Sequence, residues 1–394
     1  MDLPTVAPLR FLSRCLVNGK CTGPFFAVLF FYNCITNTSA ASFTSLGPML
    51  FDSEATRVND SYAADVSSNG EYVVGTWSTP QRSFLSFLWS RSTGVRFIPD
   101  LPPSRPYSDI PTPHDVADDG TTLMAVNSSE THAQNYLWGL DTGAIEIGNR
   151  NSRAYAITPD GQMVVGAVSD PAYWTSDQDW KILGDLPIAD SHHPRMTGTA
   201  LAVSTGGSTL VGYADYRSSQ SPELYTAFRW TSADGMHDLG LPAEYRTARA
   251  TAVSADGSIV AGSMEGRVFR WTRESGVQLF ARDGAGYPVM SDDGARIVWN
   301  GAPYPTPKVW SQRDGIKSLQ TMLIDAGANL DGWNIISVTG ISADGRTIVG
   351  DARNAIGRTH AYVATLPIPE PPSIILACLF LSALRNLMSR AKRR

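Results

Sequence analysis

Cysteine is absent from the long middle part of this 394-residue chain. Three cysteines lie near the N-terminus and one near the C-terminus: Cys15, Cys21, Cys34 and Cys378. Residues 41–370 therefore have neither a disulfide framework nor a zinc site with cysteine ligands. A segment without thiols can also enter an oxidising compartment without mispairing.

The same segment has no surplus of basic residues. The chain has 32 Lys and Arg and 37 Asp and Glu, of which 8 basic residues and 1 acidic residue lie in 1–40 and 371–394. Residues 41–370 are left with 24 basic and 36 acidic residues, a net charge of −12. Phosphate binding needs a basic face, so this balance argues against nucleic acid as a partner.

Catalytic motifs are also missing. Histidine is scarce, and the adjacent pair His192 and His193 is the most tempting candidate. Neighbouring residues on an extended chain point in different directions, and no acidic residue at a suitable spacing completes a metal site. We interpret this pair as solvated loop residues and predict no catalytic, cofactor-binding or metal-binding residue. The other histidines occupy positions in the repeats described next and are interpreted as structural: His114, His132, His237 and His360.

The middle segment does contain one five-residue pattern seven times. An apolar residue and a small residue come first, any residue is third, the fourth is Asp, Asn or Gly, and the fifth is Gly. The copies are Val66–Gly70, Val116–Gly120, Ile157–Gly161, Val203–Gly207, Val253–Gly257, Met290–Gly294 and Ile341–Gly345. Their final glycines are 50, 41, 46, 50, 37 and 51 residues apart. Blades of β-propellers repeat at about 40–50 residues, so the spacing predicts one blade per copy.

The clearest copy, 250–280, predicts four short strands. They are Ala250–Val253, Ser258–Ala261, Val268–Trp271 and Val277–Phe280. Asp256-Gly257 predicts a two-residue hairpin turn in which both residues have positive φ. The recurring aspartates could be metal ligands instead, but no nearby position supplies the other oxygen ligands of a calcium loop, which favours turn residues.

The third strand of most copies ends in tryptophan. The triplets begin at Phe87, Tyr136, Ala172, Phe228, Phe269 and Lys308, and the seventh copy has Ala361-Tyr362-Val363. Alternation places the first and third residues of a triplet on one face of the sheet. These aromatics either fill the space between blades or form a platform for sugar stacking. Their repetition once per blade favours packing.

The seventh copy lacks its fourth strand, and an unassigned strand, Phe43–Gly47, precedes the first copy. Lending that strand to the last blade closes the ring and leaves no open edge, which favours a closed propeller over an open β-solenoid. We therefore predict an all-β fold, a seven-bladed β-propeller over 42–366, with one short helix near Leu319–Ala326. The repeat units are about 61–100, 112–148, 154–187, 199–242, 250–280, 286–320 and 338–366.

The N-terminus has the order of a secretory signal. Arg10, Arg14 and Lys20 precede the apolar run 25–32, and small residues follow at 38–42. This order predicts a signal peptide over 1–40, cleaved near Ala40 or Ala41. The alternatives are an uncleaved signal anchor and a buried strand.

The C-terminal segment 367–394 has three parts in order. Pro369, Glu370 and Pro371 precede the apolar run Ile374–Leu384, and five basic residues follow. Eleven apolar residues form only about 16 Å of helix, against about 30 Å of bilayer core. On its residues alone the segment predicts a short membrane helix; one interpretation is an ordinary anchor that is never cut.

Both the repeat and the tail resemble known bacterial sequences. The blade pattern, with Thr226-Ala-Phe-Arg-Trp230 and His360-Ala-Tyr362, resembles the HAF-type extracellular repeat, which implies no particular activity. The tail resembles the PEP-CTERM sorting signal of Gram-negative bacteria. That resemblance implies recognition by a membrane-embedded exosortase and processing at Pro369, Glu370 and Pro371, with inner-membrane anchoring before it and a surface or extracellular location after it.

These observations predict an exported, non-enzymatic propeller that binds exopolysaccharide or other envelope components. The alternative is a secreted carbohydrate-active hydrolase or lyase on the same scaffold. Acidic residues with raised pKa in the central funnel would favour the enzyme, and a funnel of Ser, Thr and backbone groups would favour the scaffold.

Overall fold

The computed structural model describes residues 40–47, 60–78, 84–99, 111–127, 133–148, 152–187, 196–216, 225–240, 242, 244–282, 286–301 and 306–367. Most of them form one compact unit, Ala41–Leu366. The predicted signal peptide, His132, His192, His193 and the motif Pro369, Glu370 and Pro371 lie outside the described residues. Among the residues that are described, no helix is long and apolar enough to cross a membrane.

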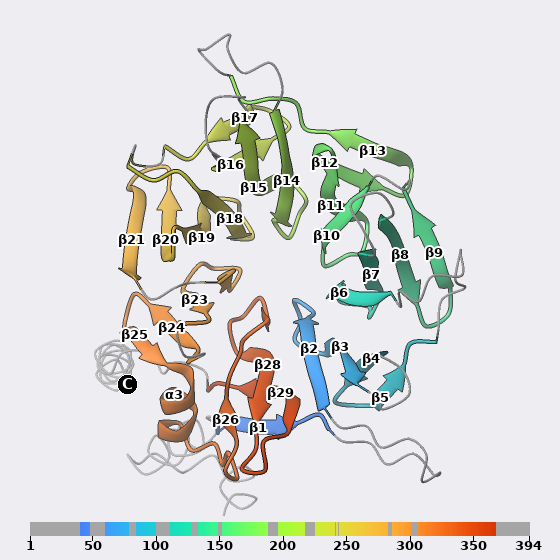
Figure 1. The fold of residues 1–394 in the computed structure, drawn as a ribbon, viewed down its shortest axis with the longest axis vertical. Helices are drawn as coiled ribbons and strands as arrows, with labels where there is room; N and C mark the ends of the chain where they lie inside the picture. The colour runs from blue at the N-terminus through green and yellow to red at the C-terminus, as the bar shows by residue number, and fades with distance from the viewer. Residues whose placement is uncertain are drawn as a thin grey trace, which may run out of the picture. The chain divides into compact units, whose positions relative to one another are not determined.

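Seven antiparallel sheets are arranged in a ring around a central axis (Figure 1). In each sheet the first strand lies next to the axis and the following strands lie progressively further out. The fold predicted from the sequence, an all-β seven-bladed propeller, is confirmed.

The first four blades follow the chain order. Blade 1 is β2 (Asp60–Val66), β3 (Tyr72–Ser78), β4 (Leu85–Ser90) and β5 (Gly94–Phe97). Blade 2 is β6 (Thr112–Val116), β7 (Thr122–Asn127), β8 (Ala133–Gly139) and β9 (Gly143–Ile147). Blade 3 is β10 (Arg153–Ile157), β11 (Met163–Val168), β12 (Asp170–Thr175) and β13 (Gln178–Ile182). Blade 4 is β14 (Met196–Val203), β15 (Thr209–Tyr216), β16 (Tyr225–Thr231) and β17 (Gly235–Asp238).

The remaining blades complete the ring. Blade 5 is β18 (Ala248–Val253), β19 (Ile259–Met264), β20 (Arg267–Thr272) and β21 (Gly276–Arg282). Blade 6 is β22 (Val289–Met290), β23 (Arg296–Trp299), β24 (Lys308–Ser311) and β25 (Gly315–Ser318). Blade 7 has a broken inner strand, β26 (Asn334–Ile335) and β27 (Gly340–Ile341), followed by β28 (Thr347–Arg353) and β29 (Thr359–Thr365). The helix α3 (Leu319–Asp325) lies between blades 6 and 7, as predicted, and buries Leu319 and Leu323.

The N-terminal strand closes the ring. Strand β1 (Ser42–Ser45) pairs antiparallel with β29, from Ser42 opposite Thr365 to Ser45 opposite Tyr362. The strand that the last copy lacks is therefore supplied by the start of the compact unit, which confirms this prediction. Closure of this kind joins the first and last blades and removes an open edge.

Apolar side chains fill the space between each pair of neighbouring blades. Seven clusters of buried residues occupy these interfaces, one for each pair. Phe87, Phe228 and Phe269 are fully buried in them, and Trp230 also donates from Nε1 to the carbonyl of Leu183 in the preceding blade (3.0 Å). The repeated aromatics are packing residues, as the once-per-blade repetition predicted.

The predicted two-residue turns are wrong. In the copy at Ser254–Gly257 the Gly257 N–H donates to the Ser254 carbonyl at 2.9 Å, and Ser254 N–H donates to Ile259 O at 2.9 Å. Gly257 has φ of +70°, whereas Asp256 is not among the residues with positive φ. The hairpin loop is longer than two residues because Asp256 also accepts from Ser254 Oγ (2.6 Å) and Ser258 N (2.9 Å), which holds the aspartate in an ordinary backbone conformation.

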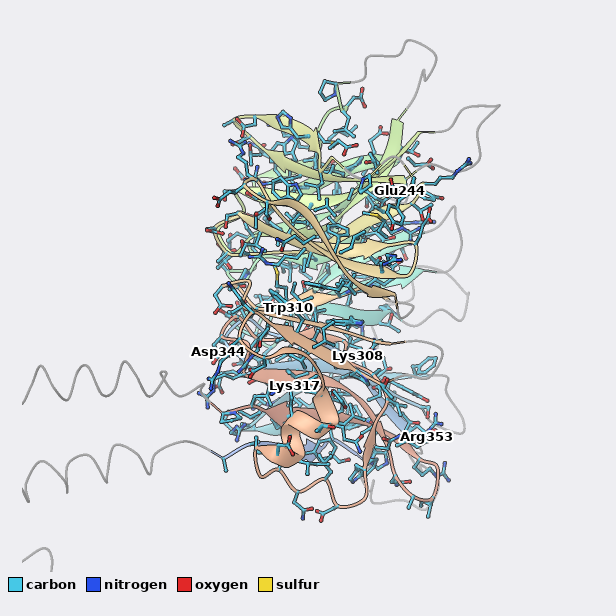
Figure 2. All side chains as sticks on the ribbon, turned by 90° about the vertical axis from the view of Figure 1, so that its left-hand side faces the viewer. Glu244, Lys308, Trp310, Lys317, Asp344 and Arg353 are labelled. Carbon is cyan, nitrogen blue, oxygen red and sulfur yellow. The ribbon has the colours of Figure 1, made fainter. Side chains whose placement is uncertain are left out.

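Neighbouring strands run in opposite directions, so the strand ends form two different faces of the ring. The turn face contains the seven repeated turns and the turns between third and fourth strands, and Asp344 lies on this side (Figure 2). The loop face contains the opposite strand ends, where blades connect to one another; Arg353 lies on that side. Since Ser42 pairs with Thr365 at the start of β1 and the end of β29, both ends of the compact unit lie at the turn face.

Candidate functional site

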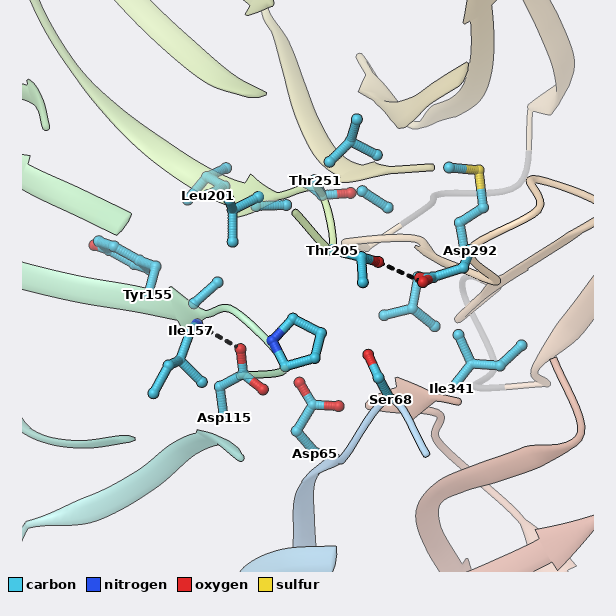
Figure 3. A pocket seen from close by; sticks show the side chains of 18 of the residues that line it. Asp65, Ser68, Asp115, Tyr155, Ile157, Leu201, Thr205, Thr251, Asp292 and Ile341 are labelled. Atoms are coloured by element: carbon cyan, nitrogen blue, oxygen red, sulfur yellow. Dashed lines mark hydrogen bonds between the residues drawn. The ribbon is translucent and has the colours of Figure 1, made fainter. Parts of the chain in front are cut away.

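A small cavity of about 200 Å³ lies on the propeller axis (Figure 3). The inner strands and the repeated turns line it, with Tyr155, Leu201 and Thr251 from the strands and Thr205 and Asp292 from the turns. Backbone hydrogen bonds join several neighbouring turns, including Asp118 N to Pro159 O and Asp292 N to Ala343 O, 2.8 and 2.9 Å. These bonds fix the turn-face end of the channel.

Two carboxyl groups, Asp65 and Asp115, meet in this cavity. Each accepts a hydrogen bond from the backbone N–H of the residue that follows it, Val66 or Val116, both at 2.7 Å. Asp115 Oδ2 also accepts from Ile157 N in blade 3 at 2.8 Å. Asp65 comes from blade 1 and Asp115 from blade 2, and both side chains line the same cavity (Figure 3).

The environment of this pair disfavours two negative charges. Desolvation is the main cause that raises the pKa of Asp65 well above its usual range, and the charge of Asp115 raises it further. Desolvation also raises the pKa of Asp115 to about 6, against the opposing effect of the Ile157 and Val116 N–H groups. Asp65 therefore takes up a proton more readily than Asp115, whose carboxylate accepts from two backbone N–H groups.

The residue before each repeated pattern explains where the pair can form. This position is Asp65, Asp115, Ala156, Ala202, Ala252, Val289 and Gly340 in the seven copies. A Cβ at Gly340 would overlap Asp65 Oδ1, so the glycine of blade 7 leaves the space that the carboxyl group occupies. Aspartate in two successive copies, where the others have small or apolar residues, is the sequence signal for this pair. It was missed because the position lies just before the five-residue pattern.

A second group of polar side chains lies at the loop-face end of the channel. We call it the aromatic–arginine cluster, and it consists of Tyr155, Tyr213, Tyr225, Arg249 and Tyr287. The Arg249 guanidinium lies over the rings of Tyr213 and Tyr225, at 4.9 and 5.1 Å from their centroids, and its Nη1 donates to Tyr287 Oη at 2.8 Å. The two tyrosine rings meet edge to face at 5.3 Å.

Tyr155 connects the cluster to the cavity. Its ring lines the cavity, and burial raises its pKa, with a smaller contribution from Tyr213 and an opposing one from Arg153. Thr199 adds a hydroxyl that donates to Tyr213 Oη at 3.3 Å. Four blades, 3 to 6, thus bring aromatic rings, hydroxyls and arginine together, a combination that the linear sequence did not reveal because its members follow no common spacing.

The repeated aspartates are turn residues, as the sequence analysis favoured. Asp256 accepts from Ser254 Oγ and from the backbone and side chain of Ser258, and these bonds lower its pKa to about 2. Asp344 accepts from Ser342 Oγ (2.6 Å) and Arg346 N (2.9 Å) in the same way. In the described part of the chain no group of three or more His, Cys, Asp or Glu side chains is placed to hold a metal ion.

The described histidines contact the blades. His360 Nδ1 lies 3.0 Å from Ser45 Oγ and its ring packs against Trp333, so it supports the closure of the ring. His237 Nε2 lies 3.0 Å from the carbonyl oxygen of Asp234 in an exposed turn. His114 lies on β6 beside Asp115, and burial lowers its pKa.

Comparisons with known proteins give a fold likeness and no family. No family model matches the chain, and no curated protein matches it. Solved structures that resemble it include the β-propeller domain of Cps50 (Swd1) from Myceliophteria thermophila, at 13% identity, covering 79% of this chain and 98% of that one with a TM-score of 0.48. Hydrazine synthase from Kuenenia stuttgartiensis is also 13% identical, covering 80% and 98% with a TM-score of 0.48. An oligogalacturonate lyase in complex with manganese is 12% identical, covering 86% and 95% with a TM-score of 0.36.

Proposed function

We propose that this protein is an exported propeller that acts without enzymatic activity as a binding and scaffold protein at the cell surface or in the extracellular matrix. In this proposal an exosortase processes the tail at Pro369, Glu370 and Pro371, and the partners are exopolysaccharide or other envelope components. The observation that supports binding is the aromatic–arginine cluster at the loop-face end of the channel. Tyrosine and arginine dominate binding sites because they bring large contact areas and directed hydrogen bonds.

The positions of the two ends of the compact unit fit this proposal. Ala41 and Leu366 lie at the turn face, whereas Tyr225, Arg249 and Tyr287 lie at the opposite ends of their strands. A tether attached after Leu366 would therefore leave from the face that does not contain the cluster. A ligand on the loop face and an attachment at the turn face do not compete for the same surface.

The enzyme alternative has one observation in its favour, the Asp65–Asp115 pair with raised pKa. The size of the site disfavours glycoside hydrolysis. The cavity of about 200 Å³ is smaller than the roughly 300–1,000 Å³ of typical ligand pockets. Binding is therefore the function we favour.

Intact mass and fractionation of the protein from its native host test the route to the surface. We expect a species outside the cells that lacks residues 1–40 and the segment after about Pro371, and we expect this species to disappear when the exosortase is deleted. A full-length C-terminus in the inner membrane of normal cells would contradict sorting and leave an anchored propeller.

Binding of residues 41–367 to the host's matrix tests the function itself. The purified propeller should sediment with washed matrix, and Arg249→Gln should sediment less. Release of reducing or unsaturated sugars from that matrix, lost in Asp115→Asn, would instead support the enzyme.

A further inference from the structure

We propose that the aromatic–arginine cluster binds a carboxylated sugar, a hexuronate unit of an acidic polysaccharide, with Arg249 holding the carboxylate and Tyr287 packing against the sugar ring. This inference rests on the proposed binding function and names its ligand class. It uses three observations, namely the charge at the cluster, the free donors of Arg249 and the exposure of Tyr287.

Among the residues that the structure describes, no acidic side chain pairs with the charge of Arg249. The side chain is half-buried, and no carboxylate among the described residues lies within ion-pairing distance of it. Arg153, which contacts Tyr155 in the same region, forms no ion pair with a described residue either. An unpaired, partly desolvated cation costs free energy, so its retention in a segment with a net charge of −12 indicates a local site for an anion.

The guanidinium is positioned to bind a planar anion. Of its five N–H donors, one is used by Tyr287 Oη, the sole acceptor it has among the residues that the structure describes. The Arg249 guanidinium lies 4.9 and 5.1 Å from the ring centroids of Tyr213 and Tyr225, and these contacts restrict the side chain. Ligand binding therefore costs less side-chain conformational entropy. Two adjacent donors on such a group match the two oxygens of a carboxylate.

The aromatic rings favour a sugar over an acidic peptide. Tyr287 is 58% exposed, and its hydroxyl is fixed by Arg249, so its ring presents a stable apolar face to solvent. A pyranose has a face of C–H groups that packs against such a ring, and its hydroxyl groups suit the nearby phenol and threonine hydroxyls of Tyr155 and Thr199. A carboxylate side chain in a peptide has no comparable face to cover Tyr287.

Affinity electrophoresis and calorimetry with three polymers test the inference. The probes are alginate, carboxyl-reduced alginate of the same length, and poly-glutamate, each with the propeller 41–367. The variants are Arg249→Gln, Tyr287→Ala and the control Arg313→Gln, which removes the same charge from an exposed position on the turn face. Thermal unfolding of every variant confirms that it is folded.

We expect alginate to bind at least tenfold more tightly than its reduced form and than poly-glutamate. Arg249→Gln should weaken alginate binding about 10- to 100-fold, the range of a lost charged hydrogen bond, while Arg313→Gln changes it less than twofold. Equal binding of the two alginate forms, equal effects of the two arginine variants, or a preference for poly-glutamate would overturn the inference. Matrix sedimentation distinguishes the two proposals. If the propeller binds the matrix and Arg249→Gln does not reduce this binding, the binding function stands and the proposed site is wrong. If the propeller does not bind the matrix at all, both proposals are wrong.

Discussion

Asn300 holds the backbone of Val338 with both ends of its side-chain amide. Its Nδ2 donates to Val338 O at 2.9 Å, and Val338 N donates to its Oδ1 at 2.8 Å. Val338 lies in the gap between β26 and β27, where the inner strand of blade 7 is interrupted. A side chain of blade 6 thus replaces the pairing that the broken strand does not provide, and it joins the two blades.

Asn300→Ala should therefore destabilise the propeller. The substitution leaves Val338 N–H and C=O without these partners, and a backbone group that loses its hydrogen bond costs about 1–3 kcal/mol of unfolding free energy. Urea denaturation followed by tryptophan fluorescence measures the loss. A change no larger than that of an exposed substitution such as Thr44→Ala would show that Val338 does not depend on Asn300.

Closure of the ring by β1 should also be measurable. Leu46 is buried among residues of blades 1 and 7, and Phe43 stacks on Tyr362 at 5.4 Å. Leu46→Ala should cost about 2–4 kcal/mol because it leaves a cavity at the joint between the first and last blades. Thr44→Ala, on the exposed side of the same strand, is the matched control and should change stability by less than about 0.5 kcal/mol.

The Asp65–Asp115 pair predicts an unusual pH dependence. Both folded-state pKa values lie above that of a free aspartate, about 3.9, so these two groups bind more protons in the folded protein than in the unfolded chain above pH 4. This pair is then most favourable at acidic pH, and its contribution falls as pH rises through about 6 for Asp115 and further for Asp65.

Asp65→Asn tests this assignment of the proton. The amide oxygen can accept from Val66 N, and the uncharged amide imitates protonated Asp65. The stability of the variant relative to wild type should increase with pH, by at most about 1.4 kcal/mol per pH unit. Denaturation at pH 4.5, 6 and 7.5 gives the comparison, with the exposed Asp141→Asn as control. Parallel profiles for Asp65→Asn and wild type would mean that Asp65 is not the protonated partner.

Substitutions at two glycines can distinguish the cost of backbone strain from the cost of a steric clash between blades. Gly257 has φ of +70° and a Cβ there would meet Thr209 of the preceding blade, whereas Gly276 has φ of +63° and open space around it. Gly276→Ala should cost about 1 kcal/mol from backbone strain alone. Gly257→Ala should cost about 2–4 kcal/mol because overlap is added to the strain. Equal losses in thermal unfolding would show that the turn moves away from Thr209 freely.

Several parts of the fold could be predicted because their signals are local. The apolar residue, the small residue and the glycine of each repeat lie within five residues, and the backbone hydrogen bonds of the turn join residues of the same repeat. The strand Phe43–Gly47 was predicted from counting, since six copies have a fourth strand and one does not. The conformation of the turns was predicted wrongly because Ser254 Oγ and the Ser258 N–H both donate to the Asp256 carboxylate. These bonds favour a longer loop than the Asp-Gly pair alone would form.

The candidate sites needed the tertiary structure. Asp65 and Asp115 are 50 residues apart in the sequence, and only the packing of blade 1 against blade 2 brings their carboxyl groups into the same cavity. Arg249, Tyr213 and Tyr287 come from three blades and meet because the strands converge toward one axis. By itself the sequence determined the number of blades, the positions of their turns and the strand that closes them, because backbone pairing and burial follow short repeated patterns. Only the closed ring decided which side chains of different blades meet near the axis. These contacts depend on how the seven sheets pack against one another, and no repeated pattern in the sequence predicts that packing.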